Sequence, residues 1–207
     1  MTKRVTISTL DNMKASGDKF VMITAYDATF AKLASEAGAD TILVGDSLGM
    51  VLQGHETTIP VSLDAMAYHT ECVARARPHS LIVSDLPFMS FSNADDTLHA
   101  STRLMQAGAQ MVKLEGGTWL SDSIHRLVER GVPVCAHLGL TPQSVNVFGG
   151  YRVQGRTPKE AKSILADAVE IQDAGASLLV LECIPAELAA DISSKLDIAV
   201  IGIGAGG

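Results

Sequence analysis

Positive charge is scarce in this chain of 207 residues. The 16 Lys and Arg side chains are outnumbered by 23 Asp and Glu side chains, which gives a formal net charge of −7. The calculated pI is near 5.3. Proteins that bind nucleic acid use a basic stripe to neutralise phosphates, and nothing here supplies one. We therefore expect no nucleic-acid partner.

Long apolar runs and closely spaced cysteines are also missing. No run of about 18 apolar residues is present, so we expect no transmembrane helix and no membrane partner. Residues 1–20 mix charged and polar side chains and lack the apolar core of a signal peptide. The three cysteines, Cys72, Cys135 and Cys183, show no CxxC spacing. We interpret them as buried thiols, which places the protein in a reducing cytoplasm.

Apolar side chains are plentiful by contrast. They make up 47% of the chain, which is enough to bury a sizeable core within one α/β domain. We expect a single domain over residues 1–207, in which residues 1–19 form a short lead-in with a helix near 8–16.

Hydrophobic periodicity and Gly or Pro breakers predict an alternation of strands and helices. Strands are expected at residues 20–25, 41–44, 81–84, 111–114, 132–136, 178–181 and 198–203. Helices are expected at residues 26–37, 63–76, 95–107, 119–130, 159–174 and 185–195, with long connections at 48–60 and 141–158. Three helices end in an Ala-Gly-Ala turn that leads into the next strand.

Strict strand–helix alternation favours a parallel sheet with helical crossovers. Seven such units without a clear dinucleotide fingerprint favour a (β/α)8 TIM barrel over an open doubly wound sheet. Such a barrel typically needs about 250 residues. We therefore expect a barrel that is truncated after its seventh strand.

Acidic or basic residues recur at the ends of the expected strands. In a barrel these ends open onto one face, where the site lies, so side chains far apart in sequence would converge there. The residues concerned are Asp46, Asp85, Glu115, His137 and Glu182. The alternative is that each acid is a helix N-cap or a first-turn residue.

Carboxylates without nearby excess Lys or Arg favour a hard divalent cation, with Mg²⁺ first. Lys113 lies two residues before Glu115, so both point to one side of their strand. This pair could hold an anionic substrate, or it could be a structural ion pair. His137 could donate to a substrate oxygen or be a hydrogen-bonded core residue. Ser47 has no neighbouring His in sequence, so we interpret it as a hydrogen-bond donor.

Two glycine-rich segments give weaker indications of function. The connection at 141–158 is long and polar, which is typical of a lid or a binding loop, or of a disordered segment. The run at 202–206 lacks the Lys-Ser/Thr of a P-loop and is weak support for phosphate binding.

Seven motifs together resemble the ketopantoate hydroxymethyltransferase family and cover essentially the whole chain. They are VGDSLGM at 44–50, SDLPFM at 84–89, MVKLEGG at 111–117, HLGLTPQS at 137–144, GGYRVQGR at 149–156, LEC at 181–183 and IGIGAG at 201–206.

The resemblance implies a barrel of the phosphoenolpyruvate mutase and isocitrate lyase superfamily. It also implies a cytoplasmic homo-oligomer, typically a decamer built as a pentamer of dimers, in pantothenate biosynthesis. The family continues beyond the last of these motifs.

The resemblance also implies the reaction and its residues. A hydroxymethyl group passes from 5,10-methylenetetrahydrofolate to 3-methyl-2-oxobutanoate through a Mg-stabilised enolate, which gives 2-dehydropantoate. Glu182 is the catalytic base in this scheme. The metal residues are Asp46, Asp85 and Glu115, and the substrate-binding residues are Asp46, Ser47, Asp85, Lys113 and His137.

Two other functions remain open at this point. One is a Mg-dependent C–C lyase acting on a 2-oxo or 2-hydroxy acid, which would not need tetrahydrofolate. The other is a catalytically silent truncated barrel, which would bind Mg²⁺ and the keto acid without turnover.

Overall fold

Strands and helices alternate along the chain. The computed structural model describes residues 4–206. The strands are β1 Met22–Thr24, β2 Thr41–Val44, β3 Leu81–Asp85, β4 Met111–Glu115, β5 Val134–Gly139, β6 Leu178–Glu182 and β7 Ala199–Ile203. The α-helices are α1 Ile7–Ser16, α2 Ala28–Glu36, α3 Leu48–Val51, α4 Leu63–Arg75, α5 Ala94–Gln106, α6 Ser121–Glu129, α7 Val145–Phe148, α8 Pro158–Asp173 and α9 Ala186–Lys195. Two 3-10 turns, Thr118–Leu120 and Pro142–Ser144, precede α6 and α7.

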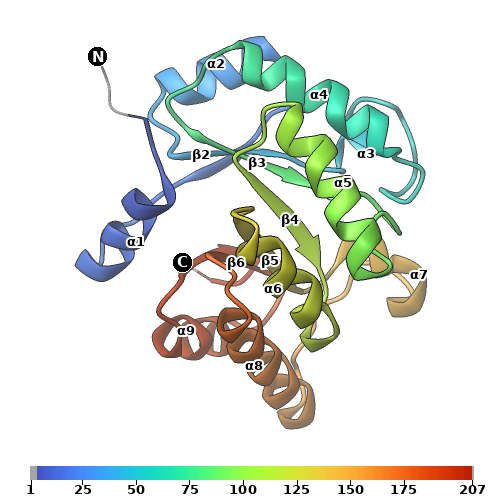
Figure 1. Ribbon diagram of the computed structural model, residues 1–207. Coiled ribbons are helices and arrows are strands. Elements are labelled where there is room, and N and C mark those ends of the chain that lie inside the picture. The colour runs from blue at the N-terminus through green and yellow to red at the C-terminus, as the bar shows by residue number, and fades with distance from the viewer. Residues whose placement is uncertain (1–3, 207) are drawn as a thin grey trace. The chain divides into compact units, whose positions relative to one another are not determined.

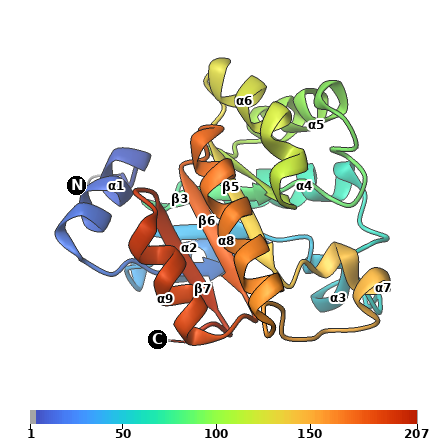
Figure 2. The ribbon, with the colours of Figure 1, turned by 90° about the horizontal axis from the view of Figure 1, so that it is seen from below.

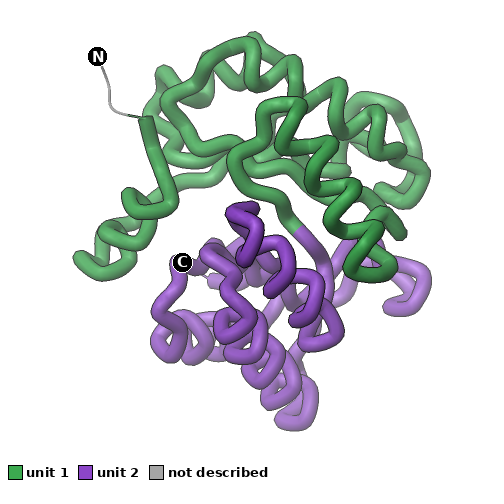
Figure 3. The backbone as a smooth tube through the Cα atoms, viewed as in Figure 1, with its two compact units in different colours: residues 1–113 green, residues 114–207 purple. Residues whose placement is uncertain are grey.

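The chain forms two compact units, residues 1–113 and residues 114–207 (Figure 3). We call them unit 1 and unit 2. The boundary falls inside β4, so this strand begins in unit 1 and ends in unit 2. A single domain over 1–207 stays a prediction.

Unit 1 is built on parallel strands that follow the order of the sequence. Met22 pairs with Thr41, Thr41 with Leu81, and Val83 with Met111. Helix α2 packs beside α4, and α4 packs beside α5 (Figure 1). β3 is buried along its whole length, as expected for a strand with apolar contacts on both faces.

Unit 2 repeats this arrangement. Cys135 in β5 pairs with Leu178 in β6, and Leu178 pairs with Ala199 in β7. The end of β4 joins β5, because the N–H of Gly116 donates to the carbonyl of His137 at 3.2 Å. Helix α8 packs against α6 and α9 (Figure 2).

Capping residues start the helices close to the positions that the sequence predicts. Asp27 caps α2, and one of its carboxylate oxygens accepts from the N–H groups of Thr29 and Phe30. Thr157 and Glu160 form a capping box at α8. Each cap satisfies N–H groups that the first turn of a helix leaves without partners.

The three Ala-Gly-Ala turns adopt one backbone solution. Gly38, Gly108 and Gly175 have φ of 94°, 111° and 105°, a region that favours glycine. In each turn the second alanine donates its N–H to a carbonyl five residues earlier, and Ala39 bonds Ala34 in this way at 3.0 Å. This bond closes the helix and directs the chain into the next strand.

Some expected boundaries differ from the observed ones. The first strand is shorter than 20–25, and the fifth runs past Ala136 to Gly139 because its pairing with β6 continues to Glu182. The connections at 48–60 and 141–158 contain the four-residue helices α3 and α7. Helices this short show no hydrophobic period in a sequence.

Candidate active site

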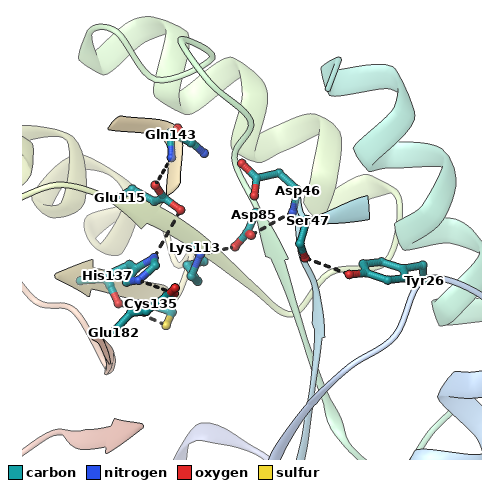
Figure 4. Close-up of polar contacts among 11 residues, drawn as sticks. Tyr26, Asp46, Ser47, Asp85, Lys113, Glu115, Cys135, His137, Gln143 and Glu182 are labelled. Atoms are coloured by element: carbon teal, nitrogen blue, oxygen red, sulfur yellow. Dashed lines mark hydrogen bonds and ion pairs between the residues drawn. The ribbon is translucent and has the colours of Figure 1, made fainter. Parts of the chain in front are cut away.

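Two buried aspartates lie at the carboxyl ends of neighbouring strands in unit 1 (Figure 4). Asp46 follows β2, and Asp85 ends β3. The backbone N–H of Asp46 donates a hydrogen bond of 3.0 Å to Oδ2 of Asp85. The register sets this contact, because Val44 pairs with Ser84. Strand pairing therefore brings together two of the residues that the sequence places at strand ends.

Gly45 makes this approach possible. A Cβ atom at position 45 would lie 2.7 Å from Oγ of Ser47 and 3.4 Å from Oδ2 of Asp85. Any side chain there would displace the Ser47 hydroxyl and crowd the Asp85 carboxylate. Packing thus favours glycine before Asp46, because it leaves the Ser47 hydroxyl in place.

Lys113 neutralises Asp85. Its Nζ donates to Oδ1 of Asp85 at 2.7 Å, and the two side chains are only 4% and 5% exposed. The residues are register partners on β4 and β3. This ion pair is made across the strands to Asp85, and the pairing of Lys113 with Glu115 that the sequence suggested stays a prediction. Sequence spacing shows which residues share a face of one strand, but it does not show the register of the next.

Ser47 contacts an aromatic residue that sequence reasoning did not select. Its Oγ lies 2.9 Å from the hydroxyl of Tyr26, in the turn that follows β1. Burial raises the pKa of the Tyr26 phenol, and the charges of Asp85 and Asp46 raise it further, against the effect of the Ser47 hydrogen bond. The only sequence signal was its position at a strand end, directly before a helix cap.

In unit 2, His137 lies between two glutamates (Figure 4). Its Nδ1 is 3.3 Å from Oε1 of Glu115, and its Nε2 is 3.3 Å from Oε2 of Glu182. The imidazole is 2% exposed, whereas the Glu182 side chain is 21% exposed. A protonated ring could donate to both carboxylates, and a neutral ring to one. Glu182 therefore combines a buried partner on one side with access to solvent and ligands.

Glu115 is held by a second contact. Its Oε2 accepts a hydrogen bond of 3.0 Å from the backbone N–H of Gln143, in the 3-10 turn after β5. Gln143 is another contact that sequence reasoning missed, since it depends on how the chain folds back after Gly139.

Cys183 directly follows Glu182 and has a φ of 47°, which is unusual for a residue other than glycine. Burial raises the pKa of its thiol, and the charge of Glu182 raises it further. The thiol is therefore protonated near neutral pH, which argues against a nucleophilic role.

The sequence of the whole chain matches known proteins. A family model described as ketopantoate hydroxymethyltransferase matches residues 4–207. The chain belongs to the ketopantoate hydroxymethyltransferase family. The 3-methyl-2-oxobutanoate hydroxymethyltransferase 2 of Pseudomonas aeruginosa is 59% identical over 202 residues, which cover 98% of this chain and 76% of that protein.

Solved structures confirm the fold class predicted for this ketopantoate hydroxymethyltransferase family member. A 2,3-dimethylmalate lyase of the PEP mutase/isocitrate lyase superfamily has a TM-score of 0.63 at 16% identity, with 92% of this chain and 68% of that chain covered. A phosphonopyruvate hydrolase in complex with oxalate and Mg²⁺ has a TM-score of 0.66 at 16% identity, with 95% and 80% covered. These likenesses show the (β/α) barrel fold.

Two of the three acidic residues that the sequence assigned to a metal site suit Mg²⁺ by their position. Across residues 4–206, no three His, Cys, Asp or Glu residues are grouped as metal ligands. Mg²⁺, however, is usually held by one or two carboxylates together with waters and substrate oxygens. Asp46 and Asp85 fit that requirement, since both are buried carboxylates at adjacent strand ends. Glu115 as a third ligand stays a prediction.

No helix within the described part of the chain is both long enough and apolar enough to cross a membrane.

Proposed function

We propose that the chain transfers a hydroxymethyl group from 5,10-methylenetetrahydrofolate to 3-methyl-2-oxobutanoate and forms 2-dehydropantoate. Membership of the ketopantoate hydroxymethyltransferase family supports the reaction. The contact between Glu182 and His137 carries the assignment of the base, because it leaves a carboxylate oriented by a buried ring yet accessible to a ligand.

The reaction needs a base at C3 of the keto acid. Glu182 takes this proton and is the catalytic residue of the proposal. His137 holds the Glu182 carboxylate through Nε2, and Glu115 holds the ring from its Nδ1 side. The C3 carbon then takes the one-carbon unit of the folate. One water is consumed, and its oxygen becomes the hydroxyl group of the product.

Mg²⁺ is the metal that we assign, with Asp46 and Asp85 as its carboxylates and Glu115 completing its surroundings. When bound, it would polarise the keto group and make the C3 hydrogen more acidic. The oxalate and Mg²⁺ in the phosphonopyruvate hydrolase structure support this choice, because oxalate is a small dicarboxylate that can chelate through two oxygens.

The remaining substrate contacts come from Ser47, Lys113 and His137. The Ser47 hydroxyl, held by Tyr26, and the Lys113 ammonium would donate to oxygens of the keto acid. His137 would donate to a substrate oxygen if its ring releases one carboxylate. Because Lys113 is already paired with Asp85, it adds a donor without adding net charge to the cluster.

Two broader assignments go with this function. We propose that the protein works in the cytoplasm, in keeping with its three free cysteines. We also propose a homo-oligomer, a decamer arranged as a pentamer of dimers, as the family resemblance implies. Sedimentation velocity in the presence and absence of Mg²⁺ tests this, and a monomer in both conditions would contradict it.

Proton NMR of 3-methyl-2-oxobutanoate in D₂O tests the chemistry. We expect the C3 hydrogen to exchange only with Mg²⁺ and to stop exchanging on addition of EDTA. Glu182→Gln should abolish exchange, whereas Glu187→Gln on α9 should not, since Glu187 lies outside the proposed site. Exchange that persists in Glu182→Gln would show that another residue is the base.

Omission of the folate separates transfer from the lyase alternative. The proposed enzyme forms a new product only when 5,10-methylenetetrahydrofolate is present. Cleavage of a 2-oxo or 2-hydroxy acid without folate would contradict the proposal.

A further inference from the structure

Unit 2 has a surface cavity that the proposed site does not use. It lies where the segment between α7 and α8 reaches the first turn of α8, and its volume is about 530 Å³. Its lining residues are Tyr151, Arg152, Val153, Arg156, Thr157 and Glu160. Two arginines and one glutamate give the lining a net charge of +1 (2 − 1), in a chain of net charge −7.

The arginines carry this charge. Within residues 4–206, the side chains of Arg152 and Arg156 form no ion pair and no hydrogen bond. The one acid in the lining, Glu160, uses Oε2 to accept from the backbone N–H of Thr157 at 3.1 Å. One oxygen of this carboxylate is therefore held by the helix cap, and no ion pair within residues 4–206 joins Glu160 to either guanidinium group.

The N-terminus of α8 does not provide the anion-binding groups of this cavity. Thr157 Oγ1 accepts from the N–H of Glu160 at 3.3 Å, and Glu160 closes the other half of the capping box. An anion in the cavity would therefore be bound by side chains. Arginine suits this task because its planar fork can donate two parallel hydrogen bonds to one carboxylate.

The cavity segment is fastened to the chain that follows the proposed base. The N–H of Gln154 donates to the carbonyl of Cys183 at 2.9 Å, and Cys183 directly follows Glu182. Gly155 is buried, and a Cβ atom there would lie 2.7 Å from Leu188 and 3.1 Å from Ile164. The segment between the two arginines is thus packed against α8 and against residues that follow the end of β6.

We infer that this cavity binds the glutamyl carboxylates of the folate co-substrate, an inference that rests on the proposed function. A reduced folate carries its one-carbon unit on the pterin, followed by an aminobenzoyl ring and a glutamate with two carboxylates. Arg152 and Arg156 bind the carboxylates. Tyr151, which is 50% exposed, packs against the aminobenzoyl ring.

The test compares two probes that differ only in the tail. Tetrahydrofolate carries the glutamate, and tetrahydropteroate lacks it. Their dissociation constants are measured by titration calorimetry for the wild type, for Arg152→Gln/Arg156→Gln and for Lys162→Gln. Lys162 is an exposed cation on α8 outside the cavity lining, so its variant makes the same kind of charge change on the same helix.

We expect the wild type and Lys162→Gln to bind tetrahydrofolate at least about tenfold more tightly than tetrahydropteroate, the effect of one charge-assisted contact. The double glutamine variant should bind both probes equally. Arg152→Lys/Arg156→Lys, which keeps the charge but not the fork, should show an intermediate preference. The wild type is also measured in 100 mM inorganic phosphate, an amount that we choose to saturate a general anion site. In phosphate it should still prefer tetrahydrofolate over tetrahydropteroate more strongly than the double glutamine variant does.

Three results would overturn the inference. They are equal binding of both probes by the wild type, an undiminished preference in the double variant, or complete loss of the preference in phosphate, which would indicate a site for any anion. The C3 hydrogen exchange needs no folate and reports separately on the proposed function. If exchange and transfer proceed without tail preference, only the inference fails; if exchange and folate binding are both absent, the two fail together.

Discussion

The ion pair between Lys113 and Asp85 has almost no access to water. Removing either charge should therefore lower the free energy of unfolding strongly. We predict that Lys113→Met lowers the free energy of unfolding by about 3 kcal/mol, because it leaves a buried carboxylate without its counter-charge. Urea denaturation followed by circular dichroism measures the change.

The chain contains a matched control for that experiment. Lys195 and Asp191 form an ion pair at 2.8 Å, but their side chains are 49% and 47% exposed. Lys195→Met should change stability by less than about 0.5 kcal/mol. Adding Asp85→Asn to Lys113→Met should restore part of the loss, since a neutral amide is less costly to bury than an unpaired charge. Equal effects at Lys113 and Lys195 would contradict the argument.

Tyr26 provides a pH-dependent reporter of the same cluster. Its raised pKa means that the unfolded chain, with a phenol near 10, loses its proton before the folded chain does. Stability from this residue is therefore complete below about pH 10 and is lost as pH rises through the folded pKa. The absorbance difference between wild type and Tyr26→Phe at 295 nm, the phenolate band, should show a midpoint above pH 10.

Bound Mg²⁺ should lower the raised pKa of Tyr26 part of the way towards its ordinary value. Burial is the largest cause of the raised pKa and does not change, but a cation on Asp46 and Asp85 would cancel the contribution of their charges. A Tyr26 midpoint that does not respond to Mg²⁺ would count against those two residues as ligands.

The sequence pattern of a charged or polar residue at the end of an apolar strand predicted the positions of most candidate site residues. It did not predict which side chains contact one another. Asp46 and Asp85 lie at the ends of β2 and β3, where the sequence placed them, because an apolar run ending in a polar residue marks the end of a parallel strand. His137 lies inside β5 and not after it, since that strand continues to Gly139. Tyr26 and Gln143 were missed, since their contacts depend on register and on a turn with no sequence signature.

At the scale of elements, the three Ala-Gly-Ala turns share a backbone but differ in their surroundings. A Cβ atom on Gly38 would meet nothing within 4 Å, whereas one on Gly108 would lie 2.5 Å from Cβ of Ala74. We predict that Gly38→Ala costs about 1–2 kcal/mol from the positive φ alone. Gly108→Ala should cost more, because α4 must also move.

Thermal unfolding of the two variants, with Gly131→Ala as a control, tests this difference. Gly131 also has a positive φ, of 79°, and open space around it, but it lies outside the repeated turn. Gly38→Ala and Gly131→Ala should show similar losses. A loss at Gly108 no greater than that at Gly38 would contradict the contact with Ala74.

The helices and strands longer than four residues were largely predictable, because their period and caps are local properties. The short helices α3 and α7 were not, since four residues give too little pattern. The strand β5 was predicted too short because His137 and Gly139 do not look like strand residues. Their pairing with β6 overrides that local preference.

For the whole molecule, the open question is whether the two units unfold together. Cys135 in β5 is fully buried, whereas Cys72 and Cys183 are partly exposed. In a Cys72→Ser/Cys183→Ser variant, alkylation of Cys135 reports opening of unit 2. If residues 1–207 are one domain, the free energy and urea dependence of this opening should equal those of global unfolding by circular dichroism.

Labelling at a clearly lower free energy would show that unit 2 opens alone, and the prediction of one domain would be wrong.

The sequence predicted the order and parallel direction of the strands, because alternation with helices allows few other connections. It did not predict the division within β4, since a division into units depends on how densely distant residues contact one another.

The position of that division has a consequence for synthesis on the ribosome. The strand pairs of unit 1 are complete at Lys113, whose carbonyl also accepts from the N–H of Leu86. At roughly 5–20 residues per second, residues 114–207 take on the order of 5–20 seconds to synthesise. The contacts among Asp46, Asp85 and Lys113 can therefore form while the codon for Glu182 is still unread.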